Sequence, residues 1–349
     1  MWTVIGVILG LLLLLFVVVR VTKLINGKKY AINTPNGVDE ELYIPVNGQE
    51  HYLLIKGEDV KNPVILHLHG GPGGPDGMAA YWFTKDLVDS FTVVCWDQRG
   101  CGNTYYRNDD RDNATVTWEQ ALADVDAVVD YLRERFGQEK VYLLGHSYGT
   151  LLGSAYSLKH PEKVAHYVSV SQVVNIKDAE TRSYIKARKM AEEPGKDTTK
   201  MVAAYDTFMK ETTIINNGKL RRLTVPYHKI PRAKNTISVG VVSPYMTWKA
   251  LKWQLLMMFR MKEGIRLNQK LINYILEVNL MEEEGAYQVP VLFVEGECDP
   301  VCPVDCVKEY MDKITAPKKE LVVFEGCGHS PNYDDPEGFA KLMKGLLES

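Results

Sequence analysis

Residues 141–149 read Val-Tyr-Leu-Leu-Gly-His-Ser-Tyr-Gly, and the chain continues with helical spacing from Thr150 to Leu158. A short apolar run therefore leads through Gly145-His146-Ser147-Tyr148-Gly149, a G-x-S-x-G motif, directly into a helix. Glycines on both sides of the serine permit a strained turn that holds the Ser147 hydroxyl above the end of a sheet. The stretch predicts a strand–turn–helix unit in which Ser147 is a nucleophile.

The segments around this unit alternate between strand and helix patterns. Further short apolar runs predict strands at 64–68, 91–96, 164–170, 291–295 and 321–324. Apolar residues at helical spacing predict helices at 119–136 and 337–347. This order predicts an α/β fold with a mostly parallel sheet and helices on both faces.

The alternation is interrupted once, which suggests how the chain is divided. Residues 173–289 carry charge-rich helical patterns, and the aromatic and Met-rich piece 245–261, with almost no strand pattern. We expect these residues to form a helical cap inserted between two parts of one core, 50–172 and 290–349. Residues 20–49 are expected to form a linker and the first strands.

Three other segments supply partners for Ser147. The glycine-rich loop His69–Gly74 follows a predicted strand and can turn backbone N–H groups toward an oxyanion, with the Tyr148 N–H as second donor. Asp299 follows the strand 291–295, and His329 lies between glycine and serine after the last strand. The chain order Ser147, Asp299, His329 is that of an α/β-hydrolase. In this arrangement His329 moves the serine proton and Asp299 orients the histidine.

The motifs resemble one branch of that superfamily. His69-Gly70-Gly71-Pro72-Gly73, Trp96-Asp97-Gln98-Arg99-Gly100-Cys101-Gly102 and the G-x-S-x-G motif are similar to those of the proline iminopeptidases. The resemblance implies a serine hydrolase that releases N-terminal residues from short peptides and needs no cofactor or metal. It also implies that Gly71 is an oxyanion donor, that His69 and Gly70 adjoin the substrate, and that Trp96 and Arg99 form the wall beside the site.

The bond that is hydrolysed stays open at this point. Aminopeptidases of the branch bind the free amine of the substrate with acidic residues of the cap, for which Glu180 and Glu277 are the candidates here. No motif aligns either residue with the family. An esterase, lipase or amidase acting on small acyl or lipid-like substrates is therefore the alternative. A binding protein on a hydrolase scaffold is disfavoured by the complete set of three residues.

Composition is that of an ordinary globular protein. The chain has 349 residues, 46% of them hydrophobic and 24% charged, with a net charge of −3. Because this balance lacks the cationic surplus that phosphate binding requires, we expect no nucleic-acid partner.

The first residues depart from this average. Trp2–Val19 contains no charged residue and spans about 27 Å as a helix, close to the roughly 30 Å of a bilayer core. No basic residue precedes the run and no A-x-A site follows it, which favours a transmembrane anchor in the lipid bilayer over a cleaved signal peptide. Arg20, Lys23, Lys28 and Lys29 follow the run, so we expect the catalytic domain on the cytoplasmic side of the membrane.

Overall fold

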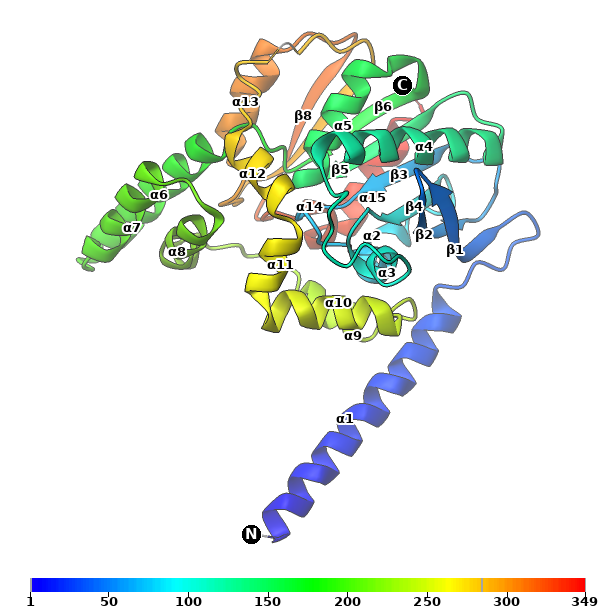
Figure 1. Cartoon of the computed structure of the whole chain (residues 1–349), viewed down its shortest axis with the longest axis horizontal. Coiled ribbons are helices and arrows are strands. Elements are labelled where there is room, and N and C mark those ends of the chain that lie inside the picture. The colour runs from blue at the N-terminus through cyan, green and yellow to red at the C-terminus, as the bar shows by residue number, and fades with distance from the viewer. Residues whose placement is uncertain (1, 284, 349) are drawn as a thin grey trace.

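A computed structural model of the chain describes residues 2–283 and 285–348 and contains one eight-stranded sheet (Figure 1). The strands are β1 (Val38–Val46), β2 (Gln49–Gly57), β3 (Val64–Leu68), β4 (Thr92–Asp97), β5 (Val141–His146), β6 (Val164–Val170), β7 (Val291–Gly296) and β8 (Lys319–Phe324). Their order is β1-β2-β4-β3-β5-β6-β7-β8. The pairs β1–β2 and β2–β4 are antiparallel, and every later pair is parallel.

Helices cover both faces of the sheet, as the alternating pattern predicted. One core cluster contains side chains of α4 (Trp118–Phe136), α5 (Tyr148–Lys159) and α13 (Val304–Lys313). The second contains side chains of α2 (Gly77–Thr84), α14 (Pro331–Asp334) and α15 (Pro336–Gly345). Two clusters form because successive side chains of a strand point to opposite faces of the sheet. In β3, for example, Leu66 belongs to the first cluster and Ile65 to the second. Two short helices, α3 (Gly102–Tyr105) and η1 (Pro161–Lys163), also belong to the part of the chain outside the segment between β6 and β7.

The expected strands at 64–68 and 164–170 are confirmed with the same bounds. Both are fully or almost fully buried, and Pro63 and Pro161 lie just before them. A buried strand of a parallel sheet gives a continuous apolar run, which makes its limits visible in the sequence.

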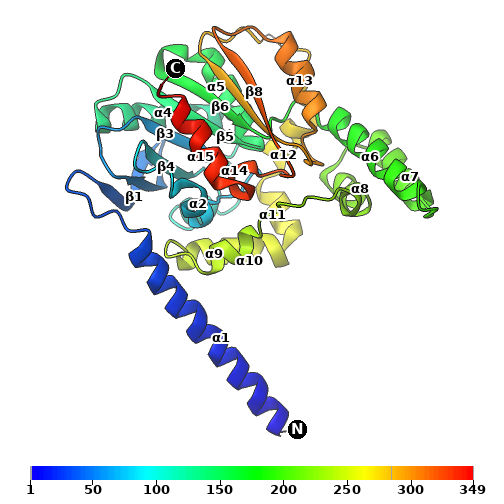
Figure 2. The ribbon, with the colours of Figure 1, turned by 180° about the vertical axis from the view of Figure 1, so that it is seen from behind.

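The described residues between β6 and β7 form helices and loops without a strand. They are α6 (Ile176–Glu192), α7 (Thr199–Lys210), α8 (Ile214–Thr224), η2 (Val225–Tyr227), α9 (Thr236–Val241), α10 (Trp248–Phe259), α11 (Met261–Leu267) and α12 (Gln269–Glu277). In both views α6–α8 and α9–α11 form two groups at the edge of the sheet where the parallel strands end (Figures 1 and 2). We refer to residues 173–289 as the cap.

The N-terminal helix α1 (Trp2–Lys29) projects away from the rest of the chain (Figure 1). None of its side chains is buried, and among the described residues it is the single helix long and apolar enough to cross a membrane. Residues 20–29, expected as linker, instead continue this helix. The reason is that Lys and Arg are good helix formers, so the end of an apolar run is no signal that a helix ends.

Candidate active site

The turn between β5 and α5 places Ser147 at the C-terminal end of a central strand. Ser147 has φ 52° and ψ −119°, in the region that non-glycine residues rarely adopt. A Cβ at Gly145 would lie 2.6 Å from the Gly149 carbonyl oxygen, and one at Gly149 would collide with the carbonyl oxygen of Leu68. Only glycine fits these two positions, which is why the motif produces this turn.

Three side chains form a hydrogen-bonded line at this edge. The Ser147 Oγ lies 2.9 Å from Nε2 of His329, and His329 Nδ1 lies 2.8 Å from Oδ2 of Asp299. Because a carboxylate accepts, Nδ1 carries the proton and Nε2 is the acceptor for the serine hydroxyl. Asp299 follows β7 and His329 follows β8, which are neighbours in the sheet.

The charge on Asp299 is held in place by its surroundings. Burial by itself would raise the pKa of this carboxyl, but the His329 ring and the Val301 backbone N–H, at 2.7 Å from Oδ1, outweigh it. The pKa of Asp299 therefore lies below its ordinary value, and the group is an anion at neutral pH.

The backbone of His329 is fixed by two donors that the sequence reasoning did not identify. Nε2 of His146 and Oγ of Ser171 donate to the His329 carbonyl oxygen at 2.8 and 3.0 Å. Burial, assisted by the nearby His329 ring, lowers the pKa of His146 to about 4. His146 is thus a neutral donor at physiological pH. The position of His146 inside the G-x-S-x-G motif is the sequence feature that could have identified it as part of the site.

A cavity of about 80 Å³ lies over Ser147. Its wall combines the core loop, the serine turn and three cap helices, with Gly71, Pro72, Ser147, Tyr148, Val173, Ile176, Ile214, Asn217, Arg221, Ile272, Ile275, Leu276 and Val301. Gly71 and Tyr148, the two expected oxyanion donors, both lie in this wall. Tyr148 is the first residue of α5, so the helix itself leaves its N–H unpaired.

Two polar residues of the wall lie on α8 and were not expected. Arg221 and Asn217 are one turn apart, and Asn217 is buried with no hydrogen-bond partner for its amide nitrogen among the described residues. No acidic side chain is among the described residues that line the cavity. Nothing local in the sequence marks Arg221, because it precedes Arg222 in a helix rich in polar residues.

Glu180 and Glu277, the expected binders of an amine, have different positions. Glu180 is buried behind the wall, and its Oε1 accepts from Arg221 Nε at 2.5 Å. Glu277 is exposed and lines a different hollow, beside Asn175 and Lys210. Of the two, Glu180 is the one whose carboxylate is hydrogen-bonded to a residue of the cavity wall in the described part of the chain.

Gly70 and His69 are close to the serine, but only Gly70 is in contact range. A Cβ on Gly70 would lie 3.1 Å from the Ser147 Cβ. His69 is buried, donates from Nδ1 to the Gly70 carbonyl at 2.8 Å and accepts the Gln98 N–H at 3.3 Å. Burial lowers its pKa to about 4, so it is a neutral link between two loops rather than part of the cavity wall.

Trp96 and Arg99 do not line the cavity, contrary to the expectation from the resemblance. Trp96 is buried in the core and donates to His51 Nδ1 at 3.1 Å. Arg99 forms a two-point ion pair with buried Asp124, at 2.5 and 2.9 Å, and donates to the Asn47 carbonyl. These contacts connect the sheet, α4 and the β1–β2 turn, and they are structural.

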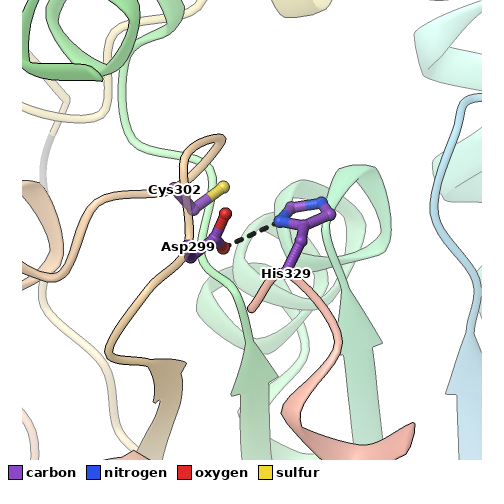
Figure 3. Close-up of side chains that lie close together, drawn as sticks. All are labelled: Asp299, Cys302 and His329. Carbon is purple, nitrogen blue, oxygen red and sulfur yellow. Dashed lines mark hydrogen bonds and ion pairs between the residues drawn. The ribbon is translucent and has the colours of Figure 1, made fainter. Parts of the chain in front are cut away.

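One group of side chains among the described residues has the spacing of metal ligands. Asp299, Cys302 and His329 offer atoms within 4.8 Å of one another (Figure 3). His329 Nδ1 already donates to Asp299, and burial raises the pKa of the Cys302 thiol well above its ordinary value. A metal ion bound here would need the Cys302 thiolate and an unprotonated Nδ1 on His329. These protonation states and hydrogen bonds therefore favour the Ser147–His329–Asp299 line over a metal site.

Comparison with known proteins decides the family. A family model for the alpha/beta hydrolase fold matches residues 63–336, from β3 to the start of α15. The chain belongs to the α/β-hydrolase fold family. This confirms the family that the glycine loop and the G-x-S-x-G motif predicted.

Individual relatives of this α/β-hydrolase extend over most of its length. It is 28% identical to the probable aminopeptidase YbaC of Bacillus subtilis over 301 residues, which cover 86% of this chain and 93% of the relative. The structure of proline iminopeptidase from Mycobacterium smegmatis aligns with a TM-score of 0.61 at 19% identity, over 88% and 98% of the two chains. A bacterial membrane phospholipase A aligns with a TM-score of 0.59 at 18% identity, over 98% and 97%. These two structures share the fold.

Proposed function

We propose that this α/β-hydrolase is a serine hydrolase that releases N-terminal residues from short peptides through an acyl-enzyme. The line of hydrogen bonds from Ser147 through His329 to Asp299 carries the proposal. The choice of a peptide bond rests on the relatives, since YbaC is described as a probable aminopeptidase and the Mycobacterium smegmatis structure as a proline iminopeptidase.

The proposed cycle follows from the donors and acceptors. His329 Nε2 takes the Ser147 proton as Oγ attacks the carbonyl carbon, and Asp299 stabilises the imidazolium that forms. The N–H groups of Gly71 and Tyr148 stabilise the oxyanion. His329 then gives the proton to the leaving amine, and a water that it activates cleaves the acyl-enzyme.

The nucleophile assignment is tested by active-site labelling. A fluorophosphonate probe should label the full chain in detergent and should fail to label Ser147→Ala. The activity of that variant should fall by about 10⁶-fold. Ser330→Ala, which changes the residue next to the histidine, is the matched control and should still be labelled. Persistent labelling of Ser147→Ala at another residue would refute the assignment.

A second candidate is hydrolysis of an ester with an apolar acyl chain. Isoleucine, leucine and valine dominate the cavity wall, and the carboxylate of Glu180 is paired with Arg221 of that wall. The alignment with a membrane phospholipase A supports the same candidate. Turnover of prolyl-anilide without turnover of a butyrate ester would favour the peptidase, and the reverse result the esterase.

Glu180 distinguishes the two candidates further. If a substrate amine displaces Arg221 from this carboxylate, Glu180→Gln should raise KM for peptides with a free N-terminus and leave N-blocked peptides unchanged. An equal effect on both kinds of peptide would remove Glu180 as the amine site.

We further propose that α1 anchors the enzyme in a lipid bilayer, with the catalytic domain on the cytoplasmic side. Its exposed apolar side chains and the basic residues Arg20, Lys23, Lys28 and Lys29 support this arrangement.

A further inference from the structure

We propose that one face of the cap is a membrane-docking surface that rests on anionic lipid headgroups beside the anchor. The surface, called here the α10 face, consists of exposed apolar side chains on α9–α11: Ile237, Trp248, Leu255, Met258, Phe259 and Met261. The inference rests on the proposed role of α1 as the anchor, and it adds a second contact with the same membrane.

The spacing of residues along α10 places large apolar side chains on two sides of the helix, with the exposed Lys252 among those on the outward side. Trp253 and Ala250 point into the protein and are buried. Trp248, Leu255 and Phe259, at i, i+7 and i+11, share the outward side, and Trp248 and Phe259 are 69% and 75% exposed. A helix on the surface of a soluble domain carries polar residues on that side. Trp and Phe on an outward helix face are typical of helices that lie in a membrane interface.

The charge of this region matches anionic lipid. Residues 236–267, which form α9–α11, contain five Lys and Arg and one acid, Glu263, in a chain whose net charge is −3. Lys252, Arg260 and Lys262 are exposed on or next to the α10 face. Basic side chains around an apolar helix face attract acidic headgroups, whereas a second copy of this chain would present the same positive charge.

Contacts between α1 and the loop before α10 place the α10 face near the membrane surface. Asn26 Nδ2 donates to the Val242 carbonyl at 2.9 Å, and Lys23 Nζ donates to the Met246 carbonyl at 3.4 Å. These bonds fix the loop before α10 to the last turns of α1, and both views show α9 and α10 beside the domain end of α1 (Figures 1 and 2).

Distances along the axis of α1 also place this loop near the membrane surface. The uncharged run ends at Val19, and at about 1.5 Å per residue Lys23 lies about 6 Å and Asn26 about 10 Å beyond it. The polar interface of a bilayer is about 5–8 Å thick on each side. When residues 2–19 fill the hydrocarbon core, Lys23 therefore lies at the level of the headgroups and Asn26 just outside them, so the loop that they bind lies at the outer boundary of the interface.

The test uses the full chain in proteoliposomes, with a polarity-sensitive fluorophore on one cysteine. Cys298 is the native cysteine that is not buried, so Cys298→Ser provides the background. Phe259→Cys reports the α10 face, Leu14→Cys reports insertion of α1, and Ile185→Cys, exposed on α6 away from both, is the matched control. A quencher attached to lipid near the headgroup should lower emission at position 259 in vesicles with anionic lipid, and a quencher attached to the acyl chain should lower emission at position 14. Emission at position 185 should not change.

Each outcome decides between the anchor and the docking surface. Quenching at positions 14 and 259 supports both the anchor and the docking surface. If purely zwitterionic vesicles weaken the quenching at 259 and leave that at 14 unchanged, the basic residues contribute to docking. Quenching at 14 without quenching at 259 overturns docking and leaves the anchor. A blue shift at 259 that lipid quencher does not reduce identifies a protein contact and overturns docking. Absence of quenching at both positions overturns both proposals. Fluorophosphonate labelling of Ser147 verifies that each variant is folded.

Discussion

At the scale of single residues, the charge state of Asp299 is the property on which the proposed chemistry depends. Its pKa is below the ordinary value because His329 and the Val301 N–H outweigh the effect of burial. In Asn one of the two accepting oxygens is replaced by an NH2 donor. Because the Val301 N–H needs the remaining oxygen, the NH2 group faces His329 Nδ1 and holds the ring in the other tautomer, with Nε2 protonated.

Asp299→Asn should therefore lower kcat on the order of 10⁴-fold while the fold is retained. Steady-state kinetics, with thermal unfolding of the same preparation, measure both effects. A loss of activity below tenfold would mean that Asp299 does not orient the proton acceptor. Asp305→Asn, at an exposed position of α13 outside the site, is the matched control and should leave both quantities unchanged.

A second residue-scale prediction concerns Asp97, which is buried at the end of β4. Burial raises its pKa to about 7, although Asn103 N and Nδ2 donate to Oδ2 at 2.7 and 2.9 Å. The folded state keeps a proton that the unfolded state loses above about pH 4, so this group lowers stability as pH rises from about 4 to 7.

Asp97→Asn removes this titration and keeps the acceptor for Asn103. Between pH 5 and 7 the wild type should lose about 2 kcal/mol more unfolding free energy than the variant. Denaturant unfolding of the two full chains in the same detergent measures the difference, in which all other titrating groups cancel. Parallel pH dependences would show that Asp97 is ionised across the range.

At the scale of elements, the turn between β5 and α5 depends on the absence of two side chains. A Cβ at Gly149 would collide with the Leu68 carbonyl oxygen, so α5 and β3 must separate to admit it. Gly149→Ala should cost about 3 kcal/mol of unfolding free energy. Gly218→Ala is the control, since a Cβ there meets nothing within 4 Å inside α8 and should stabilise by up to about 1 kcal/mol. Equal unfolding midpoints for the two variants would contradict this account of the turn.

The elements also show what could be predicted from sequence and what could not. Strands β3 and β6 and the serine turn follow from local patterns, because burial on both faces and the need for glycine act on neighbouring residues. The Arg221–Glu180 pair joins α8 to α6 across 41 positions, and Arg99 reaches Asp124 on another element. Such pairs depend on how elements pack, so a motif can identify Arg99 without showing that it pairs with Asp124 and lies outside the cavity wall. The cavity wall was missed for the same reason, since its apolar residues look like any helix core.

At the scale of the whole molecule, the proposed anchor α1 determines on which side of the membrane the proposed hydrolysis takes place. If α1 is retained and the basic residues after it stay in the cytoplasm, Ile185→Cys in the Cys298→Ser background should resist an impermeant thiol reagent on intact cells. It should react after permeabilisation. The intact mass of the purified chain, with residues 2–29 present, separates an anchor from a cleaved signal peptide. Labelling on intact cells would reverse the orientation.

The interruption of the sheet by the cap has a consequence for protein synthesis. Ser147 leaves the ribosome early, but β7, β8 and the loop with His329 follow only after the 117 residues of 173–289. A chain that ends at any position from 147 to 328 carries the serine without the proposed base. Under the proposed mechanism such fragments should be inert.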